Sequence, residues 1–225
     1  MKQNLTSTQL KEEQIVTMQT KKLRAGFGAK ILFLTMDLLY GRKGSLRKFK
    51  VLEVVARVPY IAWEQVSYIA ITHTYSKPEF AREIHSEVST HRAQQDNELF
   101  HLLIIEELLL KRGVSQGFIR FRAIPQIMAW FYYHLSWFLY AVRPKWSYAL
   151  NAQFEDHAEH EYMKYVIDHP ELEEEQWVSA FTEDYGSFET VADVLRQIAV
   201  DEREHKLESL SKIDEPRFKQ KSEKT

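Results

Sequence analysis

Two short stretches with one spacing decide how this chain folds: Asn97-Glu98-Leu99-Phe100-His101 and Asp201-Glu202-Arg203-Glu204-His205. In each, a histidine follows a glutamate by three positions. On a helix, residues three apart lie about 60° from each other on one face, so both side chains can reach one metal ion. A lone glutamate precedes each stretch, in Leu52-Glu53-Val54-Val55-Ala56-Arg57-Val58-Pro59-Tyr60 and in Phe154-Glu155-Asp156-His157-Ala158.

The order of these groups, Glu then Glu-x-x-His and both again, is typical of the ligands of di-iron or di-manganese carboxylate four-helix bundles. Carboxylates and imidazoles suit first-row metals. One Glu-x-x-His is common on any charged helix, but the doubled pattern is not. Glu53 also lies in an apolar stretch, where an unpaired carboxylate is costly. We therefore predict a metal site formed by six residues: Glu53, Glu98, His101, Glu155, Glu202 and His205.

The composition of the chain argues against several classes of protein and of metal site. The formal net charge of the 225-residue chain is -2, which gives no reason to expect a nucleic-acid partner. Only seven glycines and six prolines are present, which favours long helices over a turn-rich β fold. The chain has no cysteine, so disulfides, zinc sites with thiolate ligands and iron–sulfur clusters are excluded.

Helical segments are expected at residues 25–41, 46–73, 79–112, 117–142, 144–168 and 190–211. Pro59 should kink the second of these, and residues 169–189 should form an acidic connection. We expect one domain over residues 24–212, with loosely attached polar tails at 1–23 and 213–225. Residues 1–23 show no apolar core or cleavage pattern of a signal peptide.

Residues 123–142 carry no formal charge over a length that would cross a bilayer. A single crossing would place Glu98 and Glu155 on opposite sides of the hydrocarbon, because no second long apolar segment lies between them. One metal site then could not form. The segment must lie in the membrane plane or be buried in protein. Its many aromatic residues and basic flanks favour a flat position on the bilayer, beside residues 25–41.

The stretches quoted above, together with Phe131-Tyr132-Tyr133, resemble the alternative oxidases. They are more similar to the plastid terminal oxidase branch, whose members oxidise plastoquinol. The resemblance covers residues 45–210 and all six ligand positions. It implies an all-α, ferritin-like di-iron four-helix bundle, with two additional apolar helices for monotopic membrane attachment.

The resemblance also implies an activity. Such an enzyme oxidises a quinol, plastoquinol or ubiquinol, and reduces dioxygen to water at two Fe ions. It would lie on the lipid surface of a thylakoid or cytoplasmic membrane. A homodimer is a further expectation.

Four more positions match family positions of known role. Asn97 and Asp201 match residues that orient the ligands, and Tyr162 matches a tyrosine near the metals that can donate an electron and a proton. Tyr162 follows Glu155 by seven positions, two turns along the same helix face. Lys48 stands five positions before Glu53, where the family has an arginine near the quinol site.

One stretch departs from the family pattern. The chain has Glu155-Asp156-His157 where the mitochondrial members have three glutamates, and the plastid type also departs there, with histidines. His157 and His160 could suggest a different metal site, but we interpret them as lining the outer helix face or a hydrogen-bond shell. His85 and His91 are expected on the surface, and residues 171–175 in a solvated loop.

Two other functions fit the ligand pattern. One is a soluble di-iron hydroxylase or a ferroxidase like the ferritins, against which the apolar segments 25–41 and 123–142 argue. The other is a non-enzymatic metal-binding helical bundle. Solubility without detergent and the absence of quinol-driven oxygen uptake would distinguish these from a membrane-bound quinol oxidase.

Overall fold

The computed structural model describes residues 4–215, and this part of the chain is all-α, as predicted. A single bridge between Gln176 and Thr190 is its only β pairing. The helices in chain order are α1 (Ser7–Gln19), α2 (Phe27–Tyr40), α3 (Leu46–Ala56), α4 (Val58–Thr74), α5 (Pro78–Lys111), the π-helix η1 (Ile119–Ala123), α6 (Ile124–Val142), α7 (Pro144–Asp168), the 3-10 helix η2 (Pro170–Glu173), α8 (Thr182–Tyr185) and α9 (Val191–Ser211).

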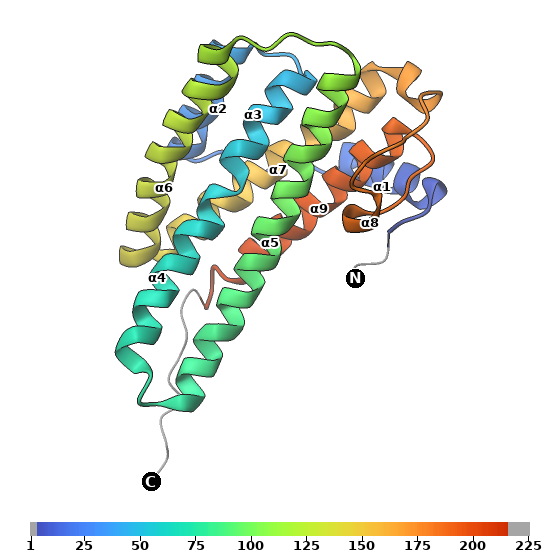
Figure 1. The fold of residues 1–225 in the computed structure, drawn as a ribbon. Helices are drawn as coiled ribbons and strands as arrows, with labels where there is room; N and C mark the ends of the chain where they lie inside the picture. The colour runs from blue at the N-terminus through green and yellow to red at the C-terminus, as the bar shows by residue number, and fades with distance from the viewer. Residues whose placement is uncertain (1–3, 216–225) are drawn as a thin grey trace.

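The bundle consists of α3 with α4, α5, α7 and α9, and it has the four helical positions that the ligand order requires (Figure 1). The closest packing joins α7 to α9 and α4 to α5. Side-chain caps fix two of the helix starts, because Ser45 accepts from the backbone N–H of Lys48 and Thr190 accepts from that of Asp193. The predicted helix at 46–73 is divided at Arg57 into α3 and α4, and Pro59 lies in the first turn of α4, where its missing N–H costs little.

Residues 7–19 correct the prediction of a loose N-terminal tail. They form α1, which starts with a capping box between Thr6 and Gln9 and packs on α7 and α9. Its inner face is partly polar, so the hydrophobic periodicity of the sequence does not predict this helix. Leu10 is fully buried, Gln14 Nε2 donates to the Met163 carbonyl at 2.9 Å, and Thr17 donates to Glu159 at 2.7 Å. Of the predicted C-terminal tail, residues 216–225 lie outside the described part of the chain.

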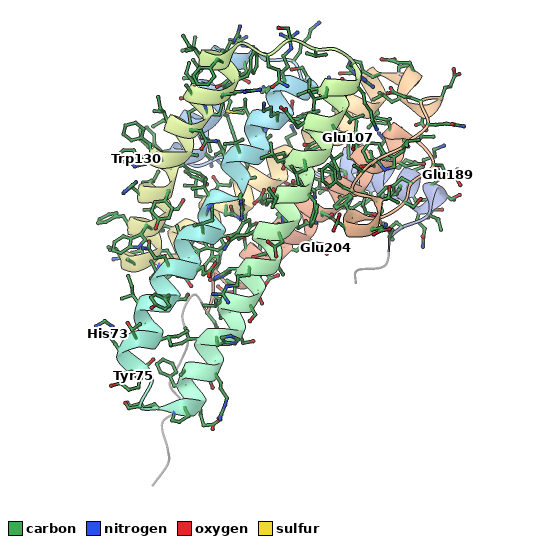
Figure 2. All side chains as sticks on the ribbon, viewed as in Figure 1. His73, Tyr75, Glu107, Trp130, Glu189 and Glu204 are labelled. Atoms are coloured by element: carbon green, nitrogen blue, oxygen red, sulfur yellow. The ribbon has the colours of Figure 1, made fainter. Side chains whose placement is uncertain are left out.

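Helix α6 runs along one side of the bundle with α2 behind it in the view of Figure 1. Both helices carry large apolar side chains that are exposed. Trp130 projects from α6 in Figure 2 and is 58% exposed. We call this surface the outer apolar face and define it by the exposed residues Phe27, Ile31, Leu34, Leu38, Ile127, Trp130, Phe131, Leu135, Phe138 and Val142. Among the residues that the structure describes, no helix combines the length and apolarity needed to cross a membrane.

Candidate metal centre

All six predicted ligand residues meet in the centre of the bundle. Glu53 comes from α3, Glu98 and His101 from α5, Glu155 from α7, and Glu202 and His205 from α9. The most exposed of the six, His205, has only 6% of its surface accessible. The helical spacing explains the convergence, because each Glu-x-x-His lies on the inner face of its helix.

The six side chains form two overlapping groups, each with ligand atoms within 4.8 Å of one another. Glu98 and Glu202 belong to both groups. The first group adds Glu53 and His101, and the second adds Glu155 and His205. Two shared carboxylates between two sets of unshared ligands are the arrangement that two bridged metal ions need.

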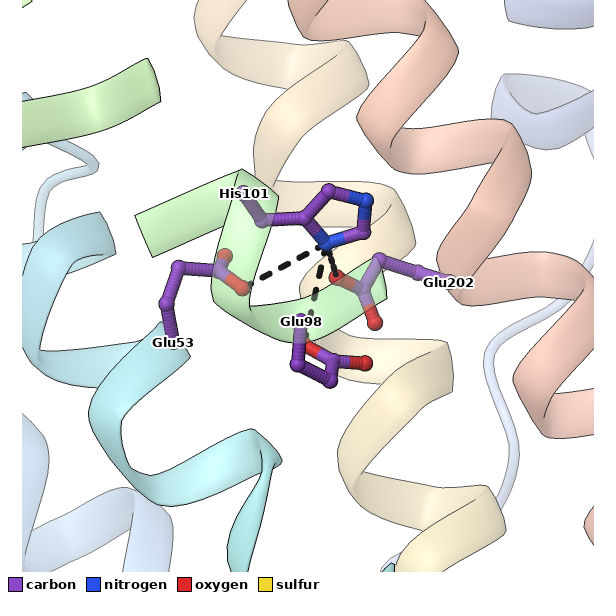
Figure 3. Close-up of side chains that lie close together, drawn as sticks. All are labelled: Glu53, Glu98, His101 and Glu202. Atoms are coloured by element: carbon purple, nitrogen blue, oxygen red, sulfur yellow. Dashed lines mark hydrogen bonds and ion pairs between the residues drawn. The ribbon is translucent and has the colours of Figure 1, made fainter. Parts of the chain in front are cut away.

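The two Glu-x-x-His motifs are paired across the bundle. His101 Nδ1 lies 3.1 Å from Glu202 Oε1, and His205 Nδ1 lies 2.7 Å from Glu98 Oε1. Figure 3 shows that His101 Nδ1 also faces Glu53 and Glu98, at 3.5 and 3.6 Å. One nitrogen that faces three carboxylates cannot donate a proton to all of them, but the same positions suit a shared cation.

The donor set fits a pair of metal ions. Within the described residues, one oxygen each of Glu53, Glu98, Glu155 and Glu202 is buried without a hydrogen-bond partner. Four buried carboxylates are costly unless protons or cations neutralise them. Oxygen and imidazole ligands without thiolate suit iron or manganese. The cluster therefore has the chemistry and the unused lone pairs of a di-metal site.

Without metal, Glu53 and Glu155 favour the protonated form. Burial raises the pKa of Glu53 and that of Glu155 well above the ordinary value, and the neighbouring charge of Glu202 raises both further. Burial also acts on Glu98, but the two histidines of the site outweigh it and lower its pKa to about 2. Metal ions must therefore displace protons from this site.

The pKa of each site histidine is raised. Burial alone would lower the pKa of His101, but the surrounding groups, Asp201 and Glu202 among them, outweigh burial. For His205, the hydrogen bond and charge of Glu98 do the same. In the metal-free protein the two imidazolium groups thus take the part of the missing cations.

Asp201 orients His101 from the side away from the carboxylates. Its Oδ2 lies 3.3 Å from His101 Nε2 and accepts from Asn97 Nδ2 at 3.2 Å and from the Tyr185 hydroxyl at 2.8 Å. Gln197 Nε2 donates to the other oxygen at 3.0 Å. This contact leaves His101 Nδ1 facing the site. Sequence reasoning included Asn97 and Asp201 but missed Tyr185, which ends the short helix α8, too short for periodicity to carry a signal.

Two tyrosines flank the cluster in a crossed arrangement. Tyr162 on α7 donates to Glu53 Oε1, and Tyr60 on α4 donates to Glu155 Oε1 at 2.8 Å. Each tyrosine follows one lone glutamate by seven positions and donates to the other. Both side chains are completely buried. The same spacing that singled out Tyr162 would have found Tyr60, which sequence reasoning did not include.

Lys48 lies outside the cluster, between α2 and α3. It is 2% exposed, and its ammonium group lies 2.7 Å from Asp37 Oδ1 on α2. This ion pair, with the Lys48 side buried and the Asp37 side partly exposed, ties the outer helix α2 to the helix that carries Glu53.

The remaining histidines have different surroundings. His91 is not on the surface as predicted: it is 2% exposed, because α5 buries it against Trp63 of α4. His160 is also buried and contacts two backbone carbonyls, those of Asp156 and Thr20. His157 stacks on Phe33 of α2 with ring centroids 4.2 Å apart.

A second acidic cluster needs no metal. Asp156, Glu159 and His160 have ligand atoms close enough for an ion. However, Lys206 already fills this position, since its ammonium group donates to Asp156 at 3.0 Å and to Glu159. His85 was predicted to lie on the surface, and it is exposed. In the acidic segment 171–175, which was predicted to be a solvated loop, Glu173 pairs with Arg196.

Comparison with known proteins assigns the family. The family model for alternative oxidases matches residues 2–210. The chain belongs to the alternative oxidase family. The match includes all six residues of the cluster and the segment of α1, so this helix lies within the family region rather than in an added tail.

A curated relative in this family is ubiquinol oxidase 4, chloroplastic/chromoplastic, from Arabidopsis thaliana. The two are 37% identical over 131 residues, which is 58% of this chain. The aligned part covers 34% of the relative, so the chain spans about a third of the relative's length. The plastid relative agrees with the resemblance to the plastid branch.

Proposed function

We propose that this alternative oxidase family member is a membrane-bound quinol oxidase that reduces dioxygen to water at two Fe ions. The observation that carries the proposal is the pair of overlapping donor groups in the bundle centre, with Glu98 and Glu202 in both. Family membership and the printed name of the plastid relative support the choice of quinol as the electron donor.

The residues divide naturally between the two ions. Glu53 and His101 would hold one, Glu155 and His205 the other, and Glu98 and Glu202 would bridge them. Bound iron supplies one-electron redox chemistry and a binding position for dioxygen. Asp201 holds His101 in the ligand orientation from the outside. Carboxylate ligands tolerate several valences because they can change their mode of binding.

Tyr162 is proposed as the catalytic proton and electron donor. Its hydroxyl donates to Glu53, and its side chain has no exposed surface. Burial raises its pKa well above the ordinary value, so the hydroxyl keeps its proton until the reaction requires it. The packed helices around it exclude bulk water from the reacting atoms.

We propose that the outer apolar face lies on the lipid surface and that the quinol enters between α2 and the bundle. Many exposed apolar side chains on two helices favour an interaction surface, and Arg42, Lys43, Arg122, Arg143 and Lys145 would lie near anionic headgroups. Lys48 and its partner Asp37 would contact the quinol headgroup. The outer apolar face is what favours this function over a soluble hydroxylase or ferroxidase.

The test joins metal analysis to a quinol assay. Protein reconstituted in vesicles should contain two Fe per chain and consume oxygen when given plastoquinol, ubiquinol or menaquinol analogues, at rates that rank these substrates. Oxygen uptake with ferrous iron but with none of the quinols would favour a ferroxidase. A folded protein that takes up no metal would favour a structural bundle. Sedimentation of the detergent-bound protein would test the homodimer.

A further inference from the structure

Beyond Tyr60, a row of oxidisable rings leads from the metal centre to the edge of the bundle. Tyr60 lies edge-on to Trp63 with ring centroids 5.2 Å apart, and Trp63 lies 4.6 Å from Tyr148 and 5.7 Å from Tyr140. The hydroxyls of Tyr140 and Tyr148 are 3.3 Å apart. We call these four residues the aromatic relay. Their exposed fractions rise outward, from 0% at Tyr60 and 1% at Trp63 to 3% at Tyr148 and 4% at Tyr140.

On the Tyr162 side of the metal centre, a phenyl ring interrupts the row of oxidisable rings among the described residues. Tyr162 stacks on Phe49 with ring centroids 4.2 Å apart, and Phe49 in turn lies edge-on to Tyr165 at 5.1 Å. A phenyl ring is far harder to oxidise than a phenol or an indole. An electron vacancy on Tyr162 therefore stays beside the metals, where it can serve turnover, whereas a vacancy on Tyr60 has an oxidisable neighbour.

We propose that the aromatic relay carries oxidising equivalents away from the metal centre when dioxygen reacts and no quinol is available. A small reductant in solution, such as ascorbate, would then restore the outer tyrosines. The proposal rests on the proposed reaction with dioxygen, but it does not require that quinol be the physiological donor.

The electrons and protons balance at each step. Tyr60 gives an electron to the oxidised site, and its hydroxyl proton moves to Glu155 Oε1 along the existing hydrogen bond. An electron from Trp63 reduces the Tyr60 radical, which takes that proton back. An electron from Tyr148 then reduces Trp63, and the Tyr148 proton passes to the Tyr140 hydroxyl as that hydroxyl releases its own proton to solvent, so both oxygens stay uncharged. Ascorbate finally supplies one electron and one proton.

The surroundings of Trp63 suit a transient positive charge on the indole. Its Nε1–H donates to the Ser147 hydroxyl oxygen at 2.8 Å, so an oxidised indole keeps an acceptor for its proton. The imidazole of His91 also lies against the indole, with a ring centroid 5.3 Å away. Burial lowers the pKa of His91 to about 3, so at neutral pH this imidazole is uncharged and does not oppose a cation on Trp63.

The experiment maps oxidative damage rather than turnover. Iron-loaded protein is reduced with dithionite, freed of excess reductant and mixed with dioxygen and ascorbate, without quinol, over repeated cycles. Peptide mass spectrometry then locates oxidised residues. Wild-type protein should show little damage near the metals. Trp63→Phe should show several-fold more oxidation at Tyr60 and the ligands, and ascorbate should not relieve it.

Two further variants keep the test sharp. Trp177→Phe is the control, because Trp177 is also buried but packs in a different hydrophobic cluster from Trp63. This variant should behave as wild type. Tyr148→Phe combined with Tyr140→Phe removes only two hydroxyls, so this variant tests the relay even if Trp63→Phe is poorly folded. In it, oxidative damage should accumulate at Trp63.

The outcomes separate the two proposals. Equal damage in the Trp63→Phe and Trp177→Phe proteins, with none at Trp63 in the tyrosine variant, would overturn the relay. If the reduced wild-type protein reacts with dioxygen but oxidises no quinol, the proposed function fails while the damage map still decides the relay. A protein that takes up no iron, or iron that does not react with dioxygen, overturns both.

Discussion

The metal centre and the outer apolar face depart from ordinary protein anatomy in opposite ways. The metal centre buries four glutamates in the middle of a helical bundle. The outer apolar face leaves Trp130, Phe131 and other large apolar side chains exposed to solvent. Each arrangement costs free energy in a protein alone in water. Each is stable only if something else satisfies it.

The comparison shows how the missing component can be identified. Buried carboxylates with unused lone pairs need cations, and the imidazoles beside them narrow the choice to first-row metals. Exposed aromatics next to basic residues are the feature from which we propose contact with a lipid surface that carries anionic headgroups. The Lys48–Asp37 pair links α2 to α3, the helix that carries Glu53.

The largest effect is expected at the shared ligands. Glu98 belongs to both donor groups and Glu53 to only one. Glu98→Ala should therefore lose both metal ions, and Glu53→Ala should keep about one of the two. Both variants should lose oxygen reduction and remain helical. Metal analysis with circular dichroism measures this, and equal metal content in the two variants would contradict the shared role of Glu98.

The outer face should respond next. Replacing Trp130, Phe131 and Phe138 by serine removes three exposed aromatics, each contributing about 1.5–3 kcal/mol when buried in lipid. Vesicle affinity should fall by at least about a thousandfold, and the melting temperature should hardly change. Co-sedimentation with anionic vesicles gives the affinity. Tyr68→Ser with Tyr75→Ser changes equally exposed aromatics away from this face and should bind as wild type.

Tyr162→Phe tests the interior without disturbing its charge. The variant removes one hydroxyl beside Glu53 and no ligand. Iron content should stay at the wild-type value, and turnover should fall by about a hundredfold, the size of effect typical for a lost proton donor. Tyr165→Phe, on the same helix and also buried, is the matched control. Wild-type turnover in the Tyr162 variant would make that tyrosine a packing residue.

The smallest effect concerns the pH dependence of the metal-free protein. The pKa values of Glu53, Glu155 and His101 are raised in the folded state, so the folded chain holds more protons than the unfolded one. Their stabilisation is present below the unfolded pKa values, 4.5 for Glu and 6.5 for His, and is lost as pH rises through the folded values. The pKa of Glu98 is lowered on folding, so its contribution to stability is lost as pH falls, but this happens only between pH 4.5 and about 2.

The melting temperature of metal-free protein should therefore fall by roughly 5 °C between about pH 5 and pH 8, because 1 kcal/mol shifts a domain of this size by about 2–4 °C. Metal-loaded protein should show no such fall, since the ions replace the protons. Differential scanning calorimetry gives both curves. Glu53→Gln removes one of the raised groups and should flatten the slope, whereas a slope unchanged in that variant would place the protons elsewhere.

The sequence predicted the bundle, and it predicted six residues that the structure brings together, because these signals are local. Helix periodicity placed α2, α5, α7 and α9 close to their observed bounds, and the Glu-x-x-His spacing put both halves of each motif on one face. What it missed depends on contacts between distant segments. His91 looked solvated on a charged helix, and only the packing of α4 shows that Trp63 covers it.

Helix α1 was missed for a related reason. Gln14 and Thr17 are buried because Met163 and Glu159 receive their hydrogen bonds, and no pattern within residues 7–19 reveals that. The role of Tyr60 was within reach, since its spacing from Glu53 repeats that of Tyr162 from Glu155. Its outward neighbours, Tyr148 and Tyr140, come from other helices and needed the fold.

The docking of α1 also constrains how the chain is made. Its partners lie far along the sequence: the Leu5 N–H donates to Gln197, 192 residues away, and Arg196 donates to Gln14 across 182 residues. Helix α1 leaves the ribosome well before α9, so its seat on α9 is absent while the intervening residues are translated. Until then its buried face must stay in water or with a chaperone. The docking of α1 is thus expected to follow the synthesis of α9.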